Sequence, residues 1–187
     1  MDLLVVSGSR NPEGQTARAI KALVGGAAEG GCQFKTFFLP RMNLERCRQC
    51  EDHGWGLCRA EGRCIIEDDF AMLVEEIRKA DAIVFATPVY FSDLSESLRA
   101  FLDRLRRVTR NNEELDRIMQ GKVAIGVCVA GGGGGGAPTC AVSLEKVVSR
   151  CGFNIVDMIP VRRQNLEMKL KVLRITGEWL AKGEHAP

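Results

Sequence analysis

The 187-residue chain is long enough for one α/β domain with a buried core and too short for two of ordinary size, so we expect a single domain over residues 1–187. Its 26 basic and 24 acidic residues are spread along the sequence and leave a net charge of +2, which argues against nucleic acid as a partner. No apolar run approaches the length of a membrane span and no signal sequence precedes the first apolar stretch, so we expect a cytoplasmic protein without a membrane partner.

The chain opens with an apolar strand, a polar turn and an amphipathic helix. Residues 3–6 form the near-continuous apolar run that is typical of a parallel strand covered on both faces. After the turn 7–16, apolar residues recur at helical spacing. A phosphate at the start of this helix would receive free backbone N–H groups, with Ser9, Arg10 and Thr16 as further donors. The alternative is a polar loop that only caps the helix and leaves Arg10 in solvent.

A second short strand, over residues 34–39, precedes an irregular insertion. Residues 40–67 have no sustained period, carry four cysteines and contain too few apolar side chains to become ordered through burial alone. We therefore expect a metal, a disulfide or a partner subunit to hold this insertion. The other four cysteines are expected to be small buried hydrophobic residues; they are Cys32, Cys128, Cys140 and Cys151.

Helices and strands alternate through the rest of the chain. The next helix is expected to be capped by Asp68 or Asp69, and each later helix is indicated by a stripe of apolar residues. The remaining strands are predicted over residues 82–86, 122–130 and 154–160. The helices are indicated by the apolar stripes at 70–77, 94–105, 144–151 and 166–180.

This alternation predicts a doubly wound α/β fold, with a five-stranded parallel sheet and helices on both faces. For five strands we expect the flavodoxin-like order 2-1-3-4-5, with the cysteine-rich insertion after strand 2 and a ligand beyond the carboxyl ends of strands 1 and 3. The loops 7–16, 87–92 and 130–137 would then meet at one crevice. The first suits a phosphate, the second presents Pro88 and two aromatic residues to a planar heterocycle, and the third lets glycine backbone approach that ring.

Several segments carry a resemblance to a known family. They are SGSRNPEGQT, FATPVYFSDLSESLRAFLDRL, the glycine run 131–136 and the cysteine segment that ends in CRAEGRCIIEDDF. Over residues 1–160 the sequence resembles the NAD(P)H-dependent FMN reductase superfamily of flavodoxin-like proteins, in particular the branch that contains the iron–sulfur flavoproteins. The resemblance implies noncovalently bound FMN, NAD(P)H as electron donor, and a small-molecule acceptor such as a quinone, an azo or nitro compound, or free flavin. It also implies a homodimer or a higher homo-oligomer, with the segment 91–99 at the contact.

The resemblance further indicates which residues would bind FMN. The phosphate would lie on the first loop and the isoalloxazine ring against the second and third. The candidate residues are Ser9, Arg10, Asn11, Gly14, Gln15, Thr16, Pro88, Val89, Tyr90, Phe91, Gly131, Gly132, Gly133 and Gly134. Because the hydride chemistry belongs to the flavin, no catalytic side chain is nominated. Basic residues at 104–107 and 162–163 are candidates for contact with a 2′-phosphate, or are simply solvated.

The cysteine spacing leaves the content of the insertion open. Cys47, Cys50, Cys58 and Cys64 follow the pattern C-x₂-C-x₇-C-x₅-C, whereas the iron–sulfur relatives resemble a more compact C-x₂-C-x₂-C followed by a fourth cysteine. Four thiolates suit a [4Fe–4S] cluster or tetrahedral zinc, and a third interpretation is no metal at all. The leading hypothesis is an FMN-dependent NAD(P)H oxidoreductase, and the alternative is an iron–sulfur flavoprotein that acts in electron transfer.

Overall fold

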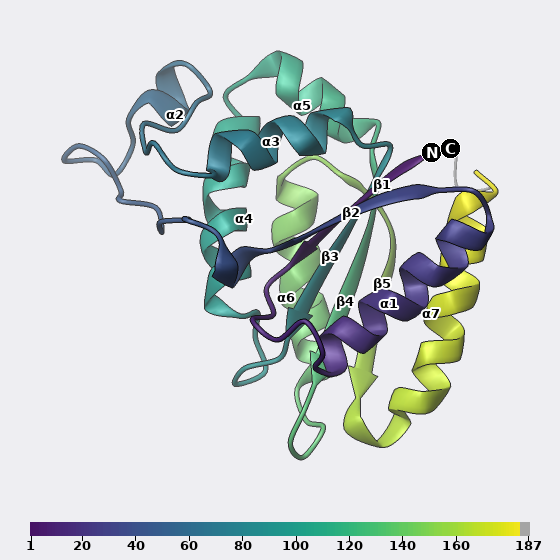
Figure 1. The fold of residues 1–187 in the computed structure, drawn as a ribbon. Coiled ribbons are helices and arrows are strands. Elements are labelled where there is room, and N and C mark those ends of the chain that lie inside the picture. Colours follow the sequence, from purple (N-terminus) through teal and green to yellow (C-terminus); the bar gives the residue numbers. More distant parts are fainter. Residues whose placement is uncertain (184–187) are drawn as a thin grey trace.

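A five-stranded parallel sheet organises the computed structural model, which describes residues 1–183 (Figure 1). Its strand order is β2-β1-β3-β4-β5, which confirms the predicted flavodoxin-like arrangement. The strands are β1 (Asp2–Ser7), β2 (Gln33–Phe38), β3 (Ala82–Pro88), β4 (Val123–Ala130) and β5 (Asn154–Arg162).

Helices cover both faces of this sheet. Figure 1 shows α1 and α7 side by side on one face, with α3, α4 and α6 on the other. No helix within residues 1–183 is both long and apolar enough to cross a bilayer. The helices are α1 (Gln15–Glu29), α2 (Leu57–Ala60), α3 (Phe70–Lys79), α4 (Glu96–Thr109), α5 (Glu113–Gln120), α6 (Ala137–Arg150) and α7 (Leu166–Ala181), with short 3₁₀ turns η1 (Leu39–Arg41) and η2 (Arg163–Asn165).

The central strands are apolar throughout because they are buried on both faces. In β1, Leu3 and Val5 join the hydrophobic core under α1 and α7, whereas Leu4 and Val6 join the core under α3, α4 and α6. The same alternation runs through β3 and β4. The four cysteines expected to be buried are all buried, which confirms that prediction.

Two helices and some helix boundaries differ from the sequence prediction. The short helices α2 and α5 were not expected. Asn112 caps α5 by accepting a hydrogen bond from the N–H of Leu115 (3.0 Å), and Leu115 and Met119 bury one face of the helix. Leu94 is buried but precedes α4, which begins after its cap, Ser95. The apolar pattern of α5, with Leu115, Ile118 and Met119 in eight residues, was too short to predict a helix.

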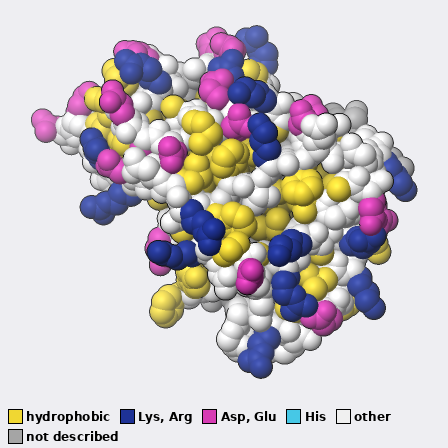
Figure 2. All heavy atoms as spheres, in the orientation of Figure 1, with side chains coloured by type: hydrophobic (Ala, Val, Ile, Leu, Met, Phe, Trp, Pro, Cys, Tyr) yellow, Lys and Arg dark blue, Asp and Glu magenta, His cyan; other side chains and the backbone are white. Residues whose placement is uncertain are grey.

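The surface carries charges of both signs. Figure 2 shows basic and acidic side chains interspersed over the face in view, with apolar side chains between them. This distribution agrees with the small net charge of +2. The view supports the expectation that no extended face of one sign is present on this side of the molecule.

Candidate functional site

A cavity of about 460 Å³ lies at the carboxyl ends of β1, β3 and β4. Its size falls within the range of about 300–1,000 Å³ that is typical of cofactor and small-molecule sites. Residues from all three predicted loops line it: Ser9, Gln15, Thr16, Pro88, Val89, Tyr90, Val129, Ala130, Gly131, Gly132 and Gly135. The structure therefore brings together three segments that lie up to about 120 residues apart in the chain.

The first loop is a turn that leaves the start of α1 open. Asn11 Oδ1 accepts a hydrogen bond from the N–H of Glu13 (2.9 Å), and Ser9 Oγ donates to the carbonyl of Asn11 (3.3 Å). Gly14 occupies the N-cap position of α1, so no side chain there accepts a bond from the first helical turn. Thr16 is buried and lines the cavity. This is the arrangement in which the start of a helix receives an anion.

Gln15 lines the cavity and carries a buried acceptor. Its Oε1 atom has no hydrogen-bond partner within residues 1–183. Buried polar atoms in native structures are nearly always hydrogen-bonded, so this oxygen fits a ligand that donates an O–H or N–H group. The ribityl hydroxyls and the ring N–H of FMN are donors of this kind. The residues of the cavity therefore fit FMN.

Small residues join the first two loops beneath the cavity. The N–H of Gly8 donates to the carbonyl of Ala86 (2.8 Å), and a Cβ at Gly8 would lie 2.1 Å from Ser95 Oγ. The N–H of Ser95 donates to Thr87 Oγ1 (3.0 Å), and Ser97 Oγ donates to the carbonyl of Gly8 (3.1 Å). The start of α4 thus fixes both loops relative to each other.

The glycine run is held by the residues that follow β5. Gln164 Nε2 donates to the carbonyl of Gly133 (2.7 Å), and Arg163 Nη1 donates to the carbonyl of Gly132 (3.3 Å). Gly134 has a φ of +77°, and a Cβ there would lie 2.0 Å from the side chain of Gln164. Gln164 was not identified from the sequence, because nothing local marks it as a neighbour of the glycine run. Arg163, a candidate for contact with a 2′-phosphate, bonds to this run instead.

Some of the predicted binding residues do not line the cavity. Arg10 is exposed, and the side chain of Phe91 is fully exposed on a backbone with a φ of +48°. The predicted residues outside the cavity lining are Arg10, Asn11, Gly14, Phe91, Gly133 and Gly134. The cavity residues Ala130 and Gly135 lie in the predicted third loop but were not named as candidates, and Val129 lies just before that loop. The position of Val129 at the end of an apolar strand was the available signal for it.

The cysteine insertion is anchored to α4 by a buried arginine. The side chains of Arg104 and Asp68 are each 1% exposed and form an ion pair through two hydrogen bonds, at 2.6 and 2.8 Å. Arg104 also donates to the carbonyl of Glu45 (2.9 Å) and to Cys64 Sγ (3.4 Å). Its guanidinium lies 4.2 Å from the ring centroid of Phe70. The insertion therefore has an anchor within the chain itself, in addition to the metal, disulfide or partner subunit that the sequence led us to expect.

A second arginine of α4 binds the tip of the insertion. Arg107 Nη1 donates to the carbonyl of Gly54 (2.9 Å), and its guanidinium lies 4.3 Å from the ring centroid of Trp55. Arg106 pairs with Asp103 on the same helix. None of these arginines lines the cavity at the strand ends, so the structure does not support their suggested contact with a 2′-phosphate there.

The four cysteines of the insertion border one small cavity beside Arg104. Cys47, Cys50, Cys58 and Cys64 all line it, and all four are free thiols. Within residues 1–183, no three His, Cys, Asp or Glu side chains lie close enough to hold a single metal ion. Zinc needs thiolates that converge at about 2.3 Å from one point, which these thiols do not do. A [4Fe–4S] cluster distributes its thiolates over four irons and requires that they surround a common space.

Comparison with known proteins identifies the family. The family model described as NADPH-dependent FMN reductase matches residues 1–166. The chain belongs to this family. An iron–sulfur flavoprotein of Methanocaldococcus jannaschii is 32% identical over 132 residues, which cover 71% of this chain and 65% of that relative, just under two thirds of its length. An iron–sulfur flavoprotein of Methanosarcina thermophila is 31% identical over 156 residues, which cover 83% of this chain and 77% of the relative.

Solved structures agree with this assignment at the level of the fold. The NAD(P)H:quinone oxidoreductase from Methanothermobacter marburgensis has a TM-score of 0.71 at 22% identity, covering 100% of this chain and 98% of that chain. The family confirms the expected flavoprotein oxidoreductase class, with FMN and NADPH in its name. It does not specify which acceptor this member uses.

Proposed function

We propose that this family member binds FMN in the cavity at the strand ends and passes electrons from NAD(P)H to a small acceptor, such as a quinone, an azo or nitro compound, or free flavin. The observation that supports this most directly is the cavity of about 460 Å³ between the three loops, together with the buried Oε1 of the lining residue Gln15, which has no hydrogen-bond partner within residues 1–183. When bound, FMN supplies the two-electron hydride chemistry. The protein's residues bind and orient it.

Each loop has a distinct part in this proposal. Ser9, Thr16 and the N–H groups that begin α1 would hold the phosphate. Pro88 and Tyr90 would border the isoalloxazine ring, and the backbone of Gly131 would approach it closely because no side chain intervenes. This division of roles requires no side-chain nucleophile or general base.

The test of this proposal is to identify the cofactor and follow its reduction. The purified protein should release stoichiometric FMN on denaturation, identified by chromatography. Addition of NADPH or NADH under anaerobic conditions should bleach the flavin absorption, and a quinone should restore it. Protein stripped of flavin provides the control. Recovery of FAD, or flavin that neither nucleotide reduces, would contradict the proposal.

A second candidate function is that of an iron–sulfur flavoprotein in electron transfer. Two observations favour it: the four cysteines that border one cavity, and the relatives that carry this name. The spacing departs from the compact pattern by about five residues, Glu51–Trp55. The end of this stretch lies on Arg107, so the structure accommodates the extra residues at the surface of α4.

Metal analysis distinguishes the two candidates. Protein purified anaerobically should contain iron and acid-labile sulfide if the four thiolates hold a cluster, and Cys58→Ser should lose that iron while retaining FMN. The retained FMN is expected because Cys58 does not line the flavin cavity. Wild-type protein with FMN but without stoichiometric iron would leave the FMN reductase proposal intact and eliminate the second candidate.

We further propose that the chain acts as a single domain in the cytoplasm. One sheet spans the described residues and the insertion packs on α4, which supports a single unit. All eight cysteines are free thiols, as a reducing compartment would keep them. Cell fractionation with thiol alkylation before lysis tests the location.

A further inference from the structure

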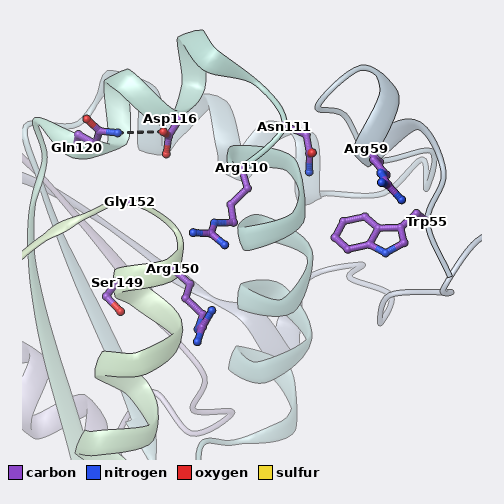
Figure 3. Close-up of a pocket in the computed structure, with 9 residues that line it drawn as sticks. All are labelled: Trp55, Arg59, Arg110, Asn111, Asp116, Gln120, Ser149, Arg150 and Gly152. Carbon is purple, nitrogen blue, oxygen red and sulfur yellow. Dashed lines mark hydrogen bonds between the residues drawn. The ribbon is translucent and has the colours of Figure 1, made fainter. Parts of the chain in front are cut away.

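A second hollow lies near the amino-terminal ends of β4 and β5, at the opposite end of the strands from the flavin cavity. It has a volume of about 790 Å³ and is located where α4 and α6 end and the chain returns to β4 and β5 (Figure 3). We call it the basic groove; it is lined by Trp55, Arg59, Arg110, Asn111, Asp116, Gln120, Ser149, Arg150 and Gly152. It therefore combines the tip of the cysteine insertion with the ends of three helices.

The basic groove has an unbalanced positive charge. Arg59, Arg110 and Arg150 line it, and none of their side chains has an ion pair or a hydrogen bond within residues 1–183. The guanidinium of Arg59 lies 5.9 Å from the ring centroid of Trp55, which carries no charge to balance it. Asp116 is the one acidic residue of the lining, and it accepts a hydrogen bond from Gln120 Nε2 (2.9 Å), which Figure 3 marks. Elsewhere in the described chain, many arginines have carboxylate partners: Arg18, Arg48, Arg63, Arg78, Arg99, Arg104, Arg106 and Arg174.

The arginines of the groove come from separate elements and share one space. Figure 3 shows Arg110 and Arg150 extending into the gap between α4 and α6, with Arg59 and Trp55 at the side formed by the insertion. Like charges that share a space repel each other, and this repulsion is relieved when an anion lies between them. The guanidinium fork is suited to phosphate oxygens.

Helix dipoles explain only part of this arrangement. Arg110 is the C-cap of α4 and Arg150 is the last residue of α6, so both interact favourably with the negative ends of these helices. Arg59 belongs to the four-residue helix α2, which has no appreciable dipole. The dipoles also leave the guanidinium N–H groups without acceptors.

We propose that the basic groove binds a small molecule that carries two or more phosphate groups. Its phosphates would lie between Arg110 and Arg150 and extend toward Arg59. Asn111 Nδ2 already donates to the carbonyl of Arg107 (2.9 Å), so only its second N–H is available as a further donor. The volume suits a ligand of nucleotide size. Because Arg59 and Trp55 belong to the insertion, ligand binding would connect the insertion to α4 and α6 and restrict its motion.

Calorimetry with inorganic triphosphate tests the proposal. The full chain is first saturated with FMN, so that the flavin phosphate site is not available to the probe. The wild-type protein should bind triphosphate, and Arg110→Gln/Arg150→Gln should weaken this binding by at least about tenfold because two charged hydrogen-bond donors are lost. Lys171→Gln/Lys182→Gln is the matched control; it removes the same charge from exposed positions at α7, on the other face of the sheet, and should leave the affinity unchanged.

Limited proteolysis gives a second readout. Triphosphate should slow cleavage within the insertion in the wild type and in the lysine control, but not in the arginine variant. If triphosphate and ATP bind equally, the groove recognises the phosphates alone. If ATP binds more tightly, its nucleoside makes additional contacts. Both results support the proposal. No binding by the wild type at about 1 mM, or equal weakening in both double variants, would overturn it.

Discussion

Arg104 connects the insertion to α4 without the help of any bound group. Its guanidinium satisfies Asp68, the carbonyl of Glu45 and Cys64 at once, although its Nε remains buried without a partner within residues 1–183. Burial alone would lower the pKa of Arg104, but its interactions with Asp68 and Cys64 together outweigh burial and raise the pKa above its usual value. The side chain is therefore charged at every relevant pH.

Removal of the charge of Arg104 should strongly destabilise the folded protein. Arg104→Met would leave the carboxylate of Asp68 buried without a counter-charge, so we expect a loss of about 3–5 kcal/mol in the free energy of unfolding. Arg106→Gln, which breaks the partly exposed pair with Asp103, should cost at most about 1 kcal/mol. Urea denaturation of both variants measures the difference, and similar losses in the two would show that Arg104 has no special role.

Asp68 should make the free energy of unfolding depend on pH in the acidic range. Burial alone would raise the pKa of this carboxyl, but hydrogen bonds from Arg104 and from the backbone N–H groups of Glu45 and Phe70 outweigh it and lower the pKa. A carboxyl with a lowered pKa in the folded state stabilises the protein above its unfolded pKa of about 3.9 and loses this contribution as the pH falls through the folded value.

We therefore expect the contribution of Asp68 to be constant near neutral pH and to begin to decrease below about pH 4. Asp68→Asn should be less stable than the wild type at pH 7 and should show a smaller further loss on acidification. Unfolding free energies measured from pH 7 to pH 3 test this expectation. Parallel curves for the two proteins would refute it.

At the scale of elements, α4 supports both candidate sites. Its start, at Ser95 and Ser97, fixes the two loops of the flavin cavity, and its second half carries Arg104 and Arg107 to the insertion. The start of α1 is the other decisive element, since it combines open backbone N–H groups with Thr16 at the cavity wall.

At the start of α1, we expect two residues of the same loop, Thr16 and Arg10, to contribute differently to FMN binding. Thr16→Val preserves the shape of the side chain but removes a hydroxyl from the cavity, so FMN should dissociate more readily, by about tenfold. Arg10→Ala should have a smaller effect, because Arg10 is exposed and does not line the cavity. Fluorescence titration of flavin-free protein with FMN compares them. A larger effect of Arg10→Ala would mean that the loop rearranges around the phosphate.

At the scale of the whole molecule, the rim of the flavin cavity presents an apolar surface. Tyr90 is 49% exposed, and Phe91 stands fully in solvent. Exposed aromatic side chains beside a site are typical of an interface. We therefore propose a homodimer that buries Phe91 beside the cavity, as the expected contact over residues 91–99 implies.

This dimer can be tested by sedimentation velocity. The wild type should sediment as a dimer at micromolar concentration, and Phe91→Ser should shift the protein toward monomer because an apolar anchor is lost. Phe34→Ser is the control; Phe34 lies near the start of the edge strand β2, is 48% exposed and does not line the flavin cavity. A monomeric wild type, or dissociation by the control but not by Phe91→Ser, would disprove this interface.

The sequence by itself determined the five strands, the helices that cover them, the parallel sheet and the three loops that meet at the carboxyl ends of its strands. These features depend on local patterns: continuous apolar runs such as residues 3–6, helical stripes, and the polar and glycine residues at strand ends. Once the alternation of strands and helices is known, the right-handed crossover restricts the topology to few possibilities. The resemblance of the loops to a flavin-binding family then follows from contiguous residues.

Only the tertiary structure decided which side chains reach each site. Arg104 belongs to a charged stretch of an amphipathic helix, yet it is buried because Asp68 and Glu45, far away in the sequence, surround it. Gln164 likewise bonds to the glycine run from 31 residues away, and Arg59 lines the same groove as Arg150, which lies still farther along the chain. Burial and pairing of a charged side chain depend on partners from other elements, and the free energy of such contacts leaves no local periodicity in the sequence.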